Sequence, residues 1–264
     1  FKKNKNVDIV LGPQSYHLLP KMIDAYKKNK EKKINTEFII NEKFDFVHED
    51  KSPKGVSSYV TIQEGCDKFC AFCVVPFTRG PEYSRSIKSI VDESKSLIDR
   101  GSKEIVLLGQ NVNAYNYKDD KNIVYNISKL IDEVSKLDNI KRIRYTTSHP
   151  NNMDLELIKL HGSNEKLMPF LHLPVQSGSN EILKKMNRKY NVDEYKKIID
   201  QLRLYKPNIE ISSDFIVGFP GETNNDFEST LDLVDYVKFK QSYSFIYSER
   251  PGTKAAKISD DTPK

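Results

Sequence analysis

The stretch Gly65-Cys66-Asp67-Lys68-Phe69-Cys70-Ala71-Phe72-Cys73 contains all three cysteines of this 264-residue chain. Their spacing is C-x₃-C-x₂-C, and an aromatic residue, Phe72, precedes the last one. Three clustered thiolates can each bind one iron of a 4Fe–4S cube, which leaves the fourth iron without a protein ligand. Clusters built only for electron transfer are normally closed by four cysteines. The spacing therefore indicates a cluster whose open iron binds a substrate or a cofactor.

Two other interpretations of the cysteines stay open at this point. A structural zinc site could use a distant histidine as its fourth ligand, and the candidates are His149, His161 and His172. Zinc ligands usually come as two compact pairs, so this spacing favours zinc less. A disulfide with one free thiol is disfavoured by the odd count, the crowded spacing and the lack of a recognisable signal peptide.

The composition is that of an ordinary soluble globular protein. Hydrophobic residues make up 38% and charged residues 30% of the chain. No apolar run approaches the roughly 18 residues that a membrane helix needs, so no membrane association is expected. The net charge of +5 is mild and does not by itself indicate nucleic acid. Because the sequence starts at Phe1 rather than Met, we expect a piece of a longer protein.

The pattern of apolar runs divides the chain into three parts. Residues 1–28 are predicted to be the end of a preceding α/β domain, and the polar residues 29–56 are predicted to be a linker. From residue 57 to residue 264, short apolar strands alternate with helical segments six times. The predicted strands are 59–63, 104–108, 142–146, 170–173, 209–217 and 241–247, and the predicted helices are 87–100, 125–136, 154–161, 181–186, 193–205 and 226–237. This alternation predicts a parallel sheet in an open partial barrel.

Polar residues and glycines follow each predicted strand. They fall at 64–66, 109–113, 147–150, 172–178, 218–222 and 247–250. Ligands of parallel α/β folds bind at the carboxyl ends of the strands. The sequence therefore predicts a pocket for a polar small molecule beside the cysteines.

The cysteine motif after the first strand of a six-fold barrel resembles that of the radical S-adenosylmethionine (SAM) enzymes. Five further stretches resemble the methylthiotransferases within that superfamily, and the resemblance covers about residues 7–264. They are Val-Pro-Phe-Thr-Arg-Gly at 75–80, Leu-Leu-Gly-Gln-Asn-Val-Asn-Ala-Tyr at 107–115, Thr-Ser-His-Pro at 147–150, Leu-Pro-Val-Gln-Ser-Gly-Ser at 173–179, and Ser-Asp-Phe-Ile-Val-Gly-Phe-Pro-Gly-Glu-Thr at 213–223. The chain is most similar to the members that act on N6-dimethylallyladenosine in tRNA.

The resemblance implies an α/β fold, a partial (β/α)₆ radical-SAM barrel, and a set of cofactor contacts. Cys66, Cys70 and Cys73 would ligate one 4Fe–4S cluster, whose open iron binds the amino and carboxylate groups of SAM. The reduced cluster then cleaves SAM to a 5′-deoxyadenosyl radical, so the three cysteines are the catalytic and metal-binding residues. The other implied cofactor contacts are Phe72, Gln110, Ser148, Gln176, Ile216 and Gly218.

One position departs from the superfamily's adenine-contact motif on the fifth strand. Ile216 and Gly218 match it, but Gly221 stands where an acidic residue is expected, and Glu222 follows one position later.

The family reaction adds a methylthio group at C2 of N6-dimethylallyladenosine next to the anticodon. It needs a second 4Fe–4S cluster, held by cysteines of an N-terminal domain, and an RNA-binding domain expected after Lys264. We therefore expect this chain to bind one cluster but not to complete methylthiolation. The implied partners are a tRNA anticodon stem-loop and an electron donor such as flavodoxin or ferredoxin, for a monomeric, cytoplasmic enzyme.

Two alternative functions remain. The substrate could be threonylcarbamoyladenosine in tRNA or an aspartate of a ribosomal protein. The chain could also be a non-catalytic RNA-binding scaffold stabilised by a structural metal.

Overall fold

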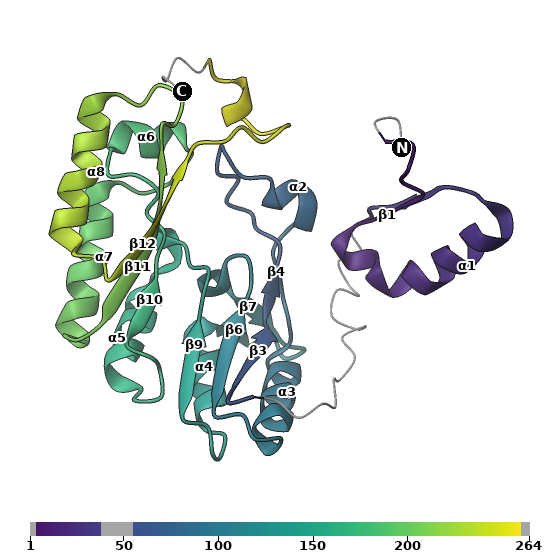
Figure 1. Cartoon of the computed structure of the whole chain (residues 1–264). Helices are drawn as coiled ribbons and strands as arrows, with labels where there is room; N and C mark the ends of the chain where they lie inside the picture. The colour runs from purple at the N-terminus through teal and green to yellow at the C-terminus, as the bar shows by residue number, and fades with distance from the viewer. Residues whose placement is uncertain (1–3, 38–54, 260–264) are drawn as a thin grey trace.

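The computed structural model describes residues 4–37 and 55–259, and its centre is a pair of three-stranded parallel sheets (Figure 1). The first has the order β3-β6-β9 and the second the order β10-β11-β12. The strands are β3 (Ser57–Thr61), β6 (Glu104–Leu108), β9 (Arg142–Tyr145), β10 (Phe170–His172), β11 (Glu210–Val217) and β12 (Gln241–Ile246). Strand order in space follows strand order in sequence, as successive β/α units dictate.

A short parallel bridge connects the two sheets. Ile143 of β9 pairs with Leu167, which lies just before β10. The Ile143 N–H donates to the carbonyl of Lys166 at 2.7 Å, and its carbonyl accepts from the N–H of Met168 at 2.9 Å. The six strands therefore form one interrupted parallel series, and the prediction of a partial (β/α)₆ barrel is confirmed.

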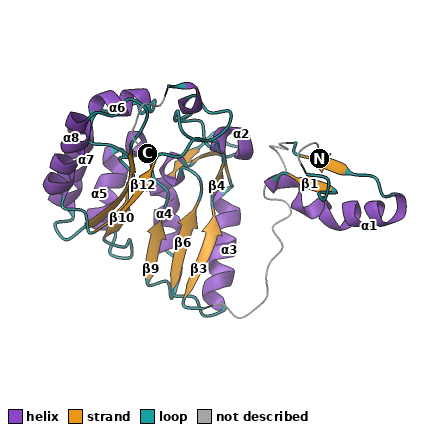
Figure 2. Cartoon of the chain, turned by 45° about the horizontal axis from the view of Figure 1, so that its top comes forward, coloured by secondary structure: helices purple, strands orange, loops and turns teal. Residues whose placement is uncertain are grey.

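Helices connect the successive strands and cover one face of the sheets (Figure 2). They are α3 (Ile87–Asp99), α4 (Ile127–Ser135), α5 (Leu155–Ser163), α6 (Asn180–Lys185), α7 (Val192–Tyr205) and α8 (Asn224–Val237). Two of them start at capping boxes, Asn191 with Glu194 for α7 and Thr223 with Asp226 for α8. These pairs satisfy backbone N–H groups that the first helical turn leaves unbonded.

The core lies between the sheets and these helices. Along β3, Val60 is fully buried toward the helices, whereas its neighbour Tyr59 is 66% exposed on the opposite face. The same alternation places Ile105, Leu107 and Ile143 in the core. The strands thus bury one face under the helices, and their carboxyl ends carry the loops of the candidate site.

Several short elements were not predicted from the sequence. One hairpin joins β4 (Gln63–Glu64) to β5 (Tyr83–Ser84), and another joins β7 (Asn116–Lys118) to β8 (Val124–Asn126). Helix α2 (Val75–Arg79) lies between β4 and β5. Elements this short show no measurable periodicity. Four 3₁₀ helices complete the described elements, at Pro13–Leu18, Val112–Ala114, Pro150–Asn152 and Ala255–Lys257.

The N-terminal segment contains β1 (Ile9–Leu11), α1 (Leu19–Asn29) and β2 (Lys33–Asn35). Strands β1 and β2 pair in parallel on either side of the helix in the sequence, so this segment forms a β-α-β unit. Strand β2 falls within the predicted linker, and residues 38–54 of that linker lie outside the described residues. The division into domains stays a prediction. None of the described helices has both the length and the apolar run that crossing a bilayer requires.

Candidate cluster site

The cysteine loop, residues 66–73, follows β4 at the carboxyl end of the first sheet. In Figure 2 the arrowheads of β3, β6 and β9 point toward the end of the molecule that carries α2. The chain enters the loop from Gly65 and returns through α2 to β5, and the Cys66 N–H donates to the Gly80 carbonyl at 3.2 Å. All three cysteines are free thiols of intermediate burial. The predicted ligands therefore lie on one loop at the expected end of the sheet.

Two glutamines from neighbouring strands fix the start of this loop. The buried Gln63 side chain accepts from the backbone N–H groups of Gln110 and Asn111, both at 3.0 Å, and donates to the Gly65 carbonyl at 2.7 Å. In return, the Gln110 side-chain oxygen accepts from the Gly65 N–H at 2.7 Å. Gln110 thus holds the residue before Cys66. Its predicted contact with SAM stays a prediction.

The connection between α6 and α7 supports the middle of the loop, although it is distant in sequence. The Met186 carbonyl accepts from the Ala71 N–H at 2.8 Å, and the Asn187 side-chain amide donates to the Phe69 carbonyl at 2.8 Å. The Ala71 carbonyl in turn accepts from the Ala255 N–H at 2.8 Å. The segments that follow β10 and β12 therefore make hydrogen bonds with backbone groups of the cysteine loop.

Arg188 is a site residue that the sequence analysis missed. Its guanidinium donates to Cys70 Sγ at 3.3 Å, to the Tyr190 hydroxyl at 2.8 Å and to the Pro174 carbonyl at 2.7 Å. The residue is only 8% exposed. In the sequence it lies in a basic run with Lys184, Lys185 and Lys189, and such runs are usually solvated. No local signal separates it from those lysines.

The predicted adenine contacts Phe72 and Ile216 lie together. Both are partly buried and pack against one small apolar cluster, whose buried members are Ala71, Ile182, Met186, Phe219 and Ala255. Gly218, two residues beyond Ile216, has a φ of +69°, and its N–H donates to the Glu222 carboxylate. Burial raises the pKa of Glu222. Glu222, which stands one position later than the acidic residue of the superfamily motif, thus accepts a hydrogen bond from the residue that follows β11.

Ser148 and Gln176 lie in the segments that follow β9 and β10. The Ser148 hydroxyl oxygen is buried and has no hydrogen-bond partner among the described residues. Gln176 has a φ of +77°, unusual for a non-glycine residue. Its N–H donates to the Asp214 carbonyl and its carbonyl accepts from the Ile216 N–H, both at 2.9 Å. Their side-chain contacts with a cofactor stay predictions.

Each of the three histidines proposed as zinc ligands has a hydrogen-bond partner of its own. His161 lies in α5, and its Nε2 is 2.7 Å from the Tyr145 hydroxyl. His172 is hydrogen bonded to Ser212 at 2.8 Å and lies 3.5 Å from the Asp214 carboxylate. Within the described residues, no three His, Cys, Asp or Glu side chains are placed to share one metal ion.

The charges that act on His149 include Lys68 of the cysteine loop and Arg188, which bonds to that loop. Burial, with smaller contributions from Arg188 and Lys68, lowers its pKa to about 2. Its Nδ1 accepts from the Asn151 N–H at 3.3 Å, and its ring contacts Tyr190 edge-on. His149 is therefore a neutral, hydrogen-bonded histidine at a strand end.

The donor chemistry of the loop fits an iron–sulfur cluster. Three soft thiols project from one short loop, and each would bind a different iron of a cube, so they need not share one ion. Protein donors already face the three sulfurs: Arg188 at Cys70, the Val75 N–H at Cys73 Sγ, 3.4 Å away, and the Lys68 backbone at Cys66. Burial raises the pKa of Cys66 to about 11 and also raises that of Cys73. Metal binding must therefore release thiol protons.

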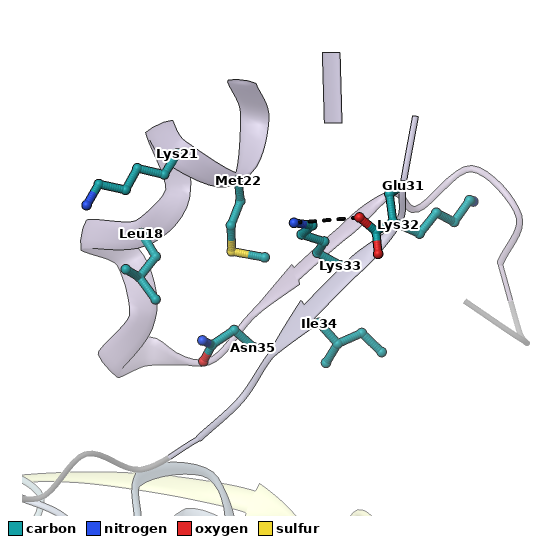
Figure 3. Close-up of a pocket in the computed structure, with 8 residues that line it drawn as sticks. All are labelled: Leu18, Lys21, Met22, Glu31, Lys32, Lys33, Ile34 and Asn35. Carbon is teal, nitrogen blue, oxygen red and sulfur yellow. Dashed lines mark ion pairs between the residues drawn. The ribbon is translucent and has the colours of Figure 1, made fainter. Parts of the chain in front are cut away.

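A separate pocket of about 480 Å³ lies in the N-terminal segment (Figure 3). Met22 of α1 and Lys33 of β2 point toward one another there, whereas Lys21 and Lys32 extend outward (Figure 3). The Lys33 ammonium is 3.7 Å from the Glu31 carboxylate. The lining residues are Leu18, Lys21, Met22, Glu31, Lys32, Lys33, Ile34 and Asn35. None of them is a predicted site residue.

Solved structures with a similar fold come from the radical SAM enzymes. The radical SAM methyltransferase TsrM from Kitasatospora setae aligns with a TM-score of 0.60 at 18% identity, over 75% of this chain and 38% of its own. Coproporphyrinogen III oxidase HemN from Escherichia coli aligns with a TM-score of 0.53 at 20% identity, over 81% of this chain and 50% of its own. At these identities the similarity shows the fold alone.

Curated relatives are much more similar in sequence. The chain is 54% identical to a tRNA-2-methylthio-N(6)-dimethylallyladenosine synthase of Anaplasma phagocytophilum, and 52% and 53% identical to those of Rickettsia akari and Rickettsia prowazekii. Each alignment covers all of this chain and 59% of the relative. The similarity to the methylthiotransferases predicted from the sequence is confirmed.

The family match coincides with the part of the chain that carries the site. It spans residues 60–234, from β3 through most of α8, and includes the cysteine loop and all six predicted cofactor contacts. Because it covers well over half of the sequence, this chain belongs to the radical SAM superfamily.

Proposed function

We propose that this chain is the radical-SAM core of a tRNA methylthiotransferase that adds a methylthio group at C2 of N6-dimethylallyladenosine next to the anticodon. The observation that carries this proposal is the loop with three thiols at the carboxyl end of a parallel partial barrel. The 52–54% identity to synthases named for that nucleoside supports the choice of reaction. The chain spans 59% of those relatives, so the activity would belong to a longer protein.

The proposed cofactors are one 4Fe–4S cluster and SAM. Cys66, Cys70 and Cys73 would hold the cluster, which, when bound and reduced, supplies the electron that cleaves SAM. Phe72 and Ile216 offer an apolar wall of the kind that packs on an adenine ring. The Ser148 hydroxyl, which has no hydrogen-bond partner in the described part of the chain, is suited to a polar contact with the same nucleoside. The protein's part is binding and orientation.

The proposed substrate would approach the face of the sheets opposite the helices. Exposed aromatic side chains lie on that face, including Tyr59 at 66%, Tyr243 at 48% and Phe245 at 56%. Aromatic rings bind unstacked RNA bases by stacking. We propose a tRNA anticodon stem-loop as the partner, a one-electron donor such as flavodoxin or ferredoxin, and action as a cytoplasmic monomer.

Metal analysis of the chain tests the cofactor assignment. After anaerobic reconstitution, we expect roughly four iron and four sulfide per chain, together with 5′-deoxyadenosine when SAM and dithionite are added. A single zinc and no 5′-deoxyadenosine would instead support a metal-stabilised scaffold. Because sulfur insertion is expected to need a second cluster, this chain alone should form no methylthio product.

The full-length enzyme tests the substrate. It is offered an anticodon stem-loop carrying N6-dimethylallyladenosine, one carrying threonylcarbamoyladenosine, and a ribosomal protein with a target aspartate. We expect the mass shift of a methylthio group on the first alone. A shift on either of the others and none on the first would overturn the substrate assignment while leaving the cluster assignment intact.

A further inference from the structure

A buried cation is bonded to one of the predicted cluster ligands. Arg188 is 8% exposed, and its Nη1 donates to Cys70 Sγ at 3.3 Å. Within residues 4–37 and 55–259, no ion pair joins Arg188 to a carboxylate, whereas the other buried arginine, Arg85, is paired with Glu93. A buried charge is costly unless an opposite charge or several hydrogen bonds compensate it. Among the described residues, the sulfur of Cys70 is the one bonded partner of Arg188 that becomes anionic when it binds a metal.

Neutral acceptors orient the guanidinium toward that sulfur. The Tyr190 hydroxyl accepts from Nε at 2.8 Å and the Pro174 carbonyl accepts from Nη2 at 2.7 Å. The Tyr190 hydroxyl is itself fixed, because it donates to the Val175 carbonyl at 2.7 Å. Three nitrogens of one planar group are thus bonded in three directions, a geometry that a lysine ammonium cannot reproduce.

The backbone around Arg188 is fixed to the same loop. The two residues before it, Met186 and Asn187, bond to Ala71 and Phe69, which flank Cys70 on either side. Three consecutive residues of the α6–α7 connection therefore contact three consecutive residues of the cysteine loop. The backbone at Arg188 is therefore held beside Cys70.

A cluster at this site would place negative charge beside Arg188. Three thiolates make the assembly anionic, and reduction by one electron makes it more so. Net charge and hydrogen bonds to the sulfurs are the factors by which a protein sets the potential of an iron–sulfur cluster. A nearby fixed cation stabilises the more negative state and so raises the reduction potential.

We propose that Arg188 is the built-in counter-charge of the cluster, acting through Cys70 to raise its reduction potential and so favour the reduced state. This inference rests on the proposed cluster at the three cysteines. Arg188 is a positioning and tuning residue in this role. The donor of the electron would be a separate one-electron reductant.

The test is an EPR-monitored redox titration of the reconstituted holoprotein. We expect Arg188→Gln to shift the potential to a more negative value, and Arg188→Lys to shift it less because the charge is kept. The matched control is Arg79→Gln, since Arg79 lies in the same region but pairs with Glu64 at 3.1 Å and has a side chain that is 43% exposed. Its potential should equal that of the parent.

The outcomes separate this inference from the proposed function. A parent that forms no cluster would remove the function and the inference together. A parent-like potential in Arg188→Gln, with weaker SAM binding, would overturn the inference and assign Arg188 to the carboxylate of SAM. If Arg188→Gln retains no iron, a second neutral variant, Arg188→Met, is titrated in its place: a lowered potential supports the counter-charge, and a parent-like one overturns it.

Discussion

The cysteine loop and the outer helices obtain their shapes from different parts of the chain. Helices α7 and α8 start at capping boxes whose two members are three residues apart, and their buried side chains follow helical spacing. The cysteine loop has almost no regular structure. It is held by Gln63 and Gln110 on one side and by residues 186–188 on the other. The helices are thus encoded locally and the site by contacts across the chain.

The largest expected effect is the loss of the cluster when one of its three ligands is removed, with no change in the fold. Cys70→Ala should abolish the brown chromophore and 5′-deoxyadenosine formation, because two thiolates cannot hold the cube. The side-chain hydrogen bond that this change removes comes from Arg188, which lies in the connection between α6 and α7. The far-UV circular dichroism of the apoprotein should therefore match that of the parent. Continued 5′-deoxyadenosine formation by the variant would refute the ligand assignment.

The next prediction tests whether distant packing sets the shape of the loop. Gly65 has a φ of +82°, and a Cβ there would lie 2.0 Å from the Pro81 carbonyl oxygen. Gly65→Ala should lower the free energy of unfolding by about 4 kcal/mol, at the upper end of single-substitution effects. Urea denaturation and iron content after reconstitution measure the two consequences.

The matched control for Gly65 is another glycine with nearly the same backbone conformation. Gly252 has a φ of +86°, and a Cβ added there would have no atom within 4 Å. Gly252→Ala should cost only the backbone strain, about 1–2 kcal/mol. Equal losses from both changes would mean that the contact with Pro81 contributes nothing to the loop.

The same contrast explains what the sequence predicts and what it misses. Six strands, six helices and the cysteine ligands are predicted because periodicity, turn residues and ligand spacing are local signals. Arg188 is missed because it resembles the neighbouring lysines until its contacts are known. Gln110 is predicted as a cofactor contact, yet in the structure its side-chain oxygen also accepts a hydrogen bond from the Gly65 N–H. The hairpins β4–β5 and β7–β8 are too short to show a period.

A pH dependence of stability is expected from two buried histidines, and His161 of α5 is the one that lies in the helix layer. Burial, with a smaller contribution from Lys206, lowers the pKa of His161 from 6.5 to about 4. Between these values the unfolded chain binds more protons than the folded one, so stability rises with pH across this window and is lost as pH falls through it. The shift corresponds to about 3 kcal/mol.

The measurement is the free energy of unfolding of the apoprotein between pH 7 and pH 4, for the parent and for His161→Gln. We expect the decline toward pH 4 to be shallower in the variant, and the part that remains to come from His149, whose pKa is also lowered by burial. If the unfolding free energy of His161→Gln fell with pH as steeply as that of the parent, protonation of His161 would cost the folded protein no stability. The 2.7 Å hydrogen bond between Tyr145 and His161 would then not reflect tight packing of the helix layer.

The smallest effect concerns a single helix end. The Thr223 side chain accepts from the Asp226 N–H at 3.3 Å, and the Asp226 carboxylate accepts from the Thr223 N–H at 2.9 Å. Thr223→Ala should cost about 1 kcal/mol, the usual loss for an N-cap residue, and leave iron content and reduction potential unchanged. Asp226 also bonds to the Ser179 hydroxyl at the start of α6, and α6 leads into the connection that holds the cysteine loop. If Thr223→Ala also lowered the iron content, the start of α8 would be coupled to the cysteine loop through Asp226 and Ser179. The local contacts that form the helices and the long-range contacts that hold the loop would then not be independent in this protein.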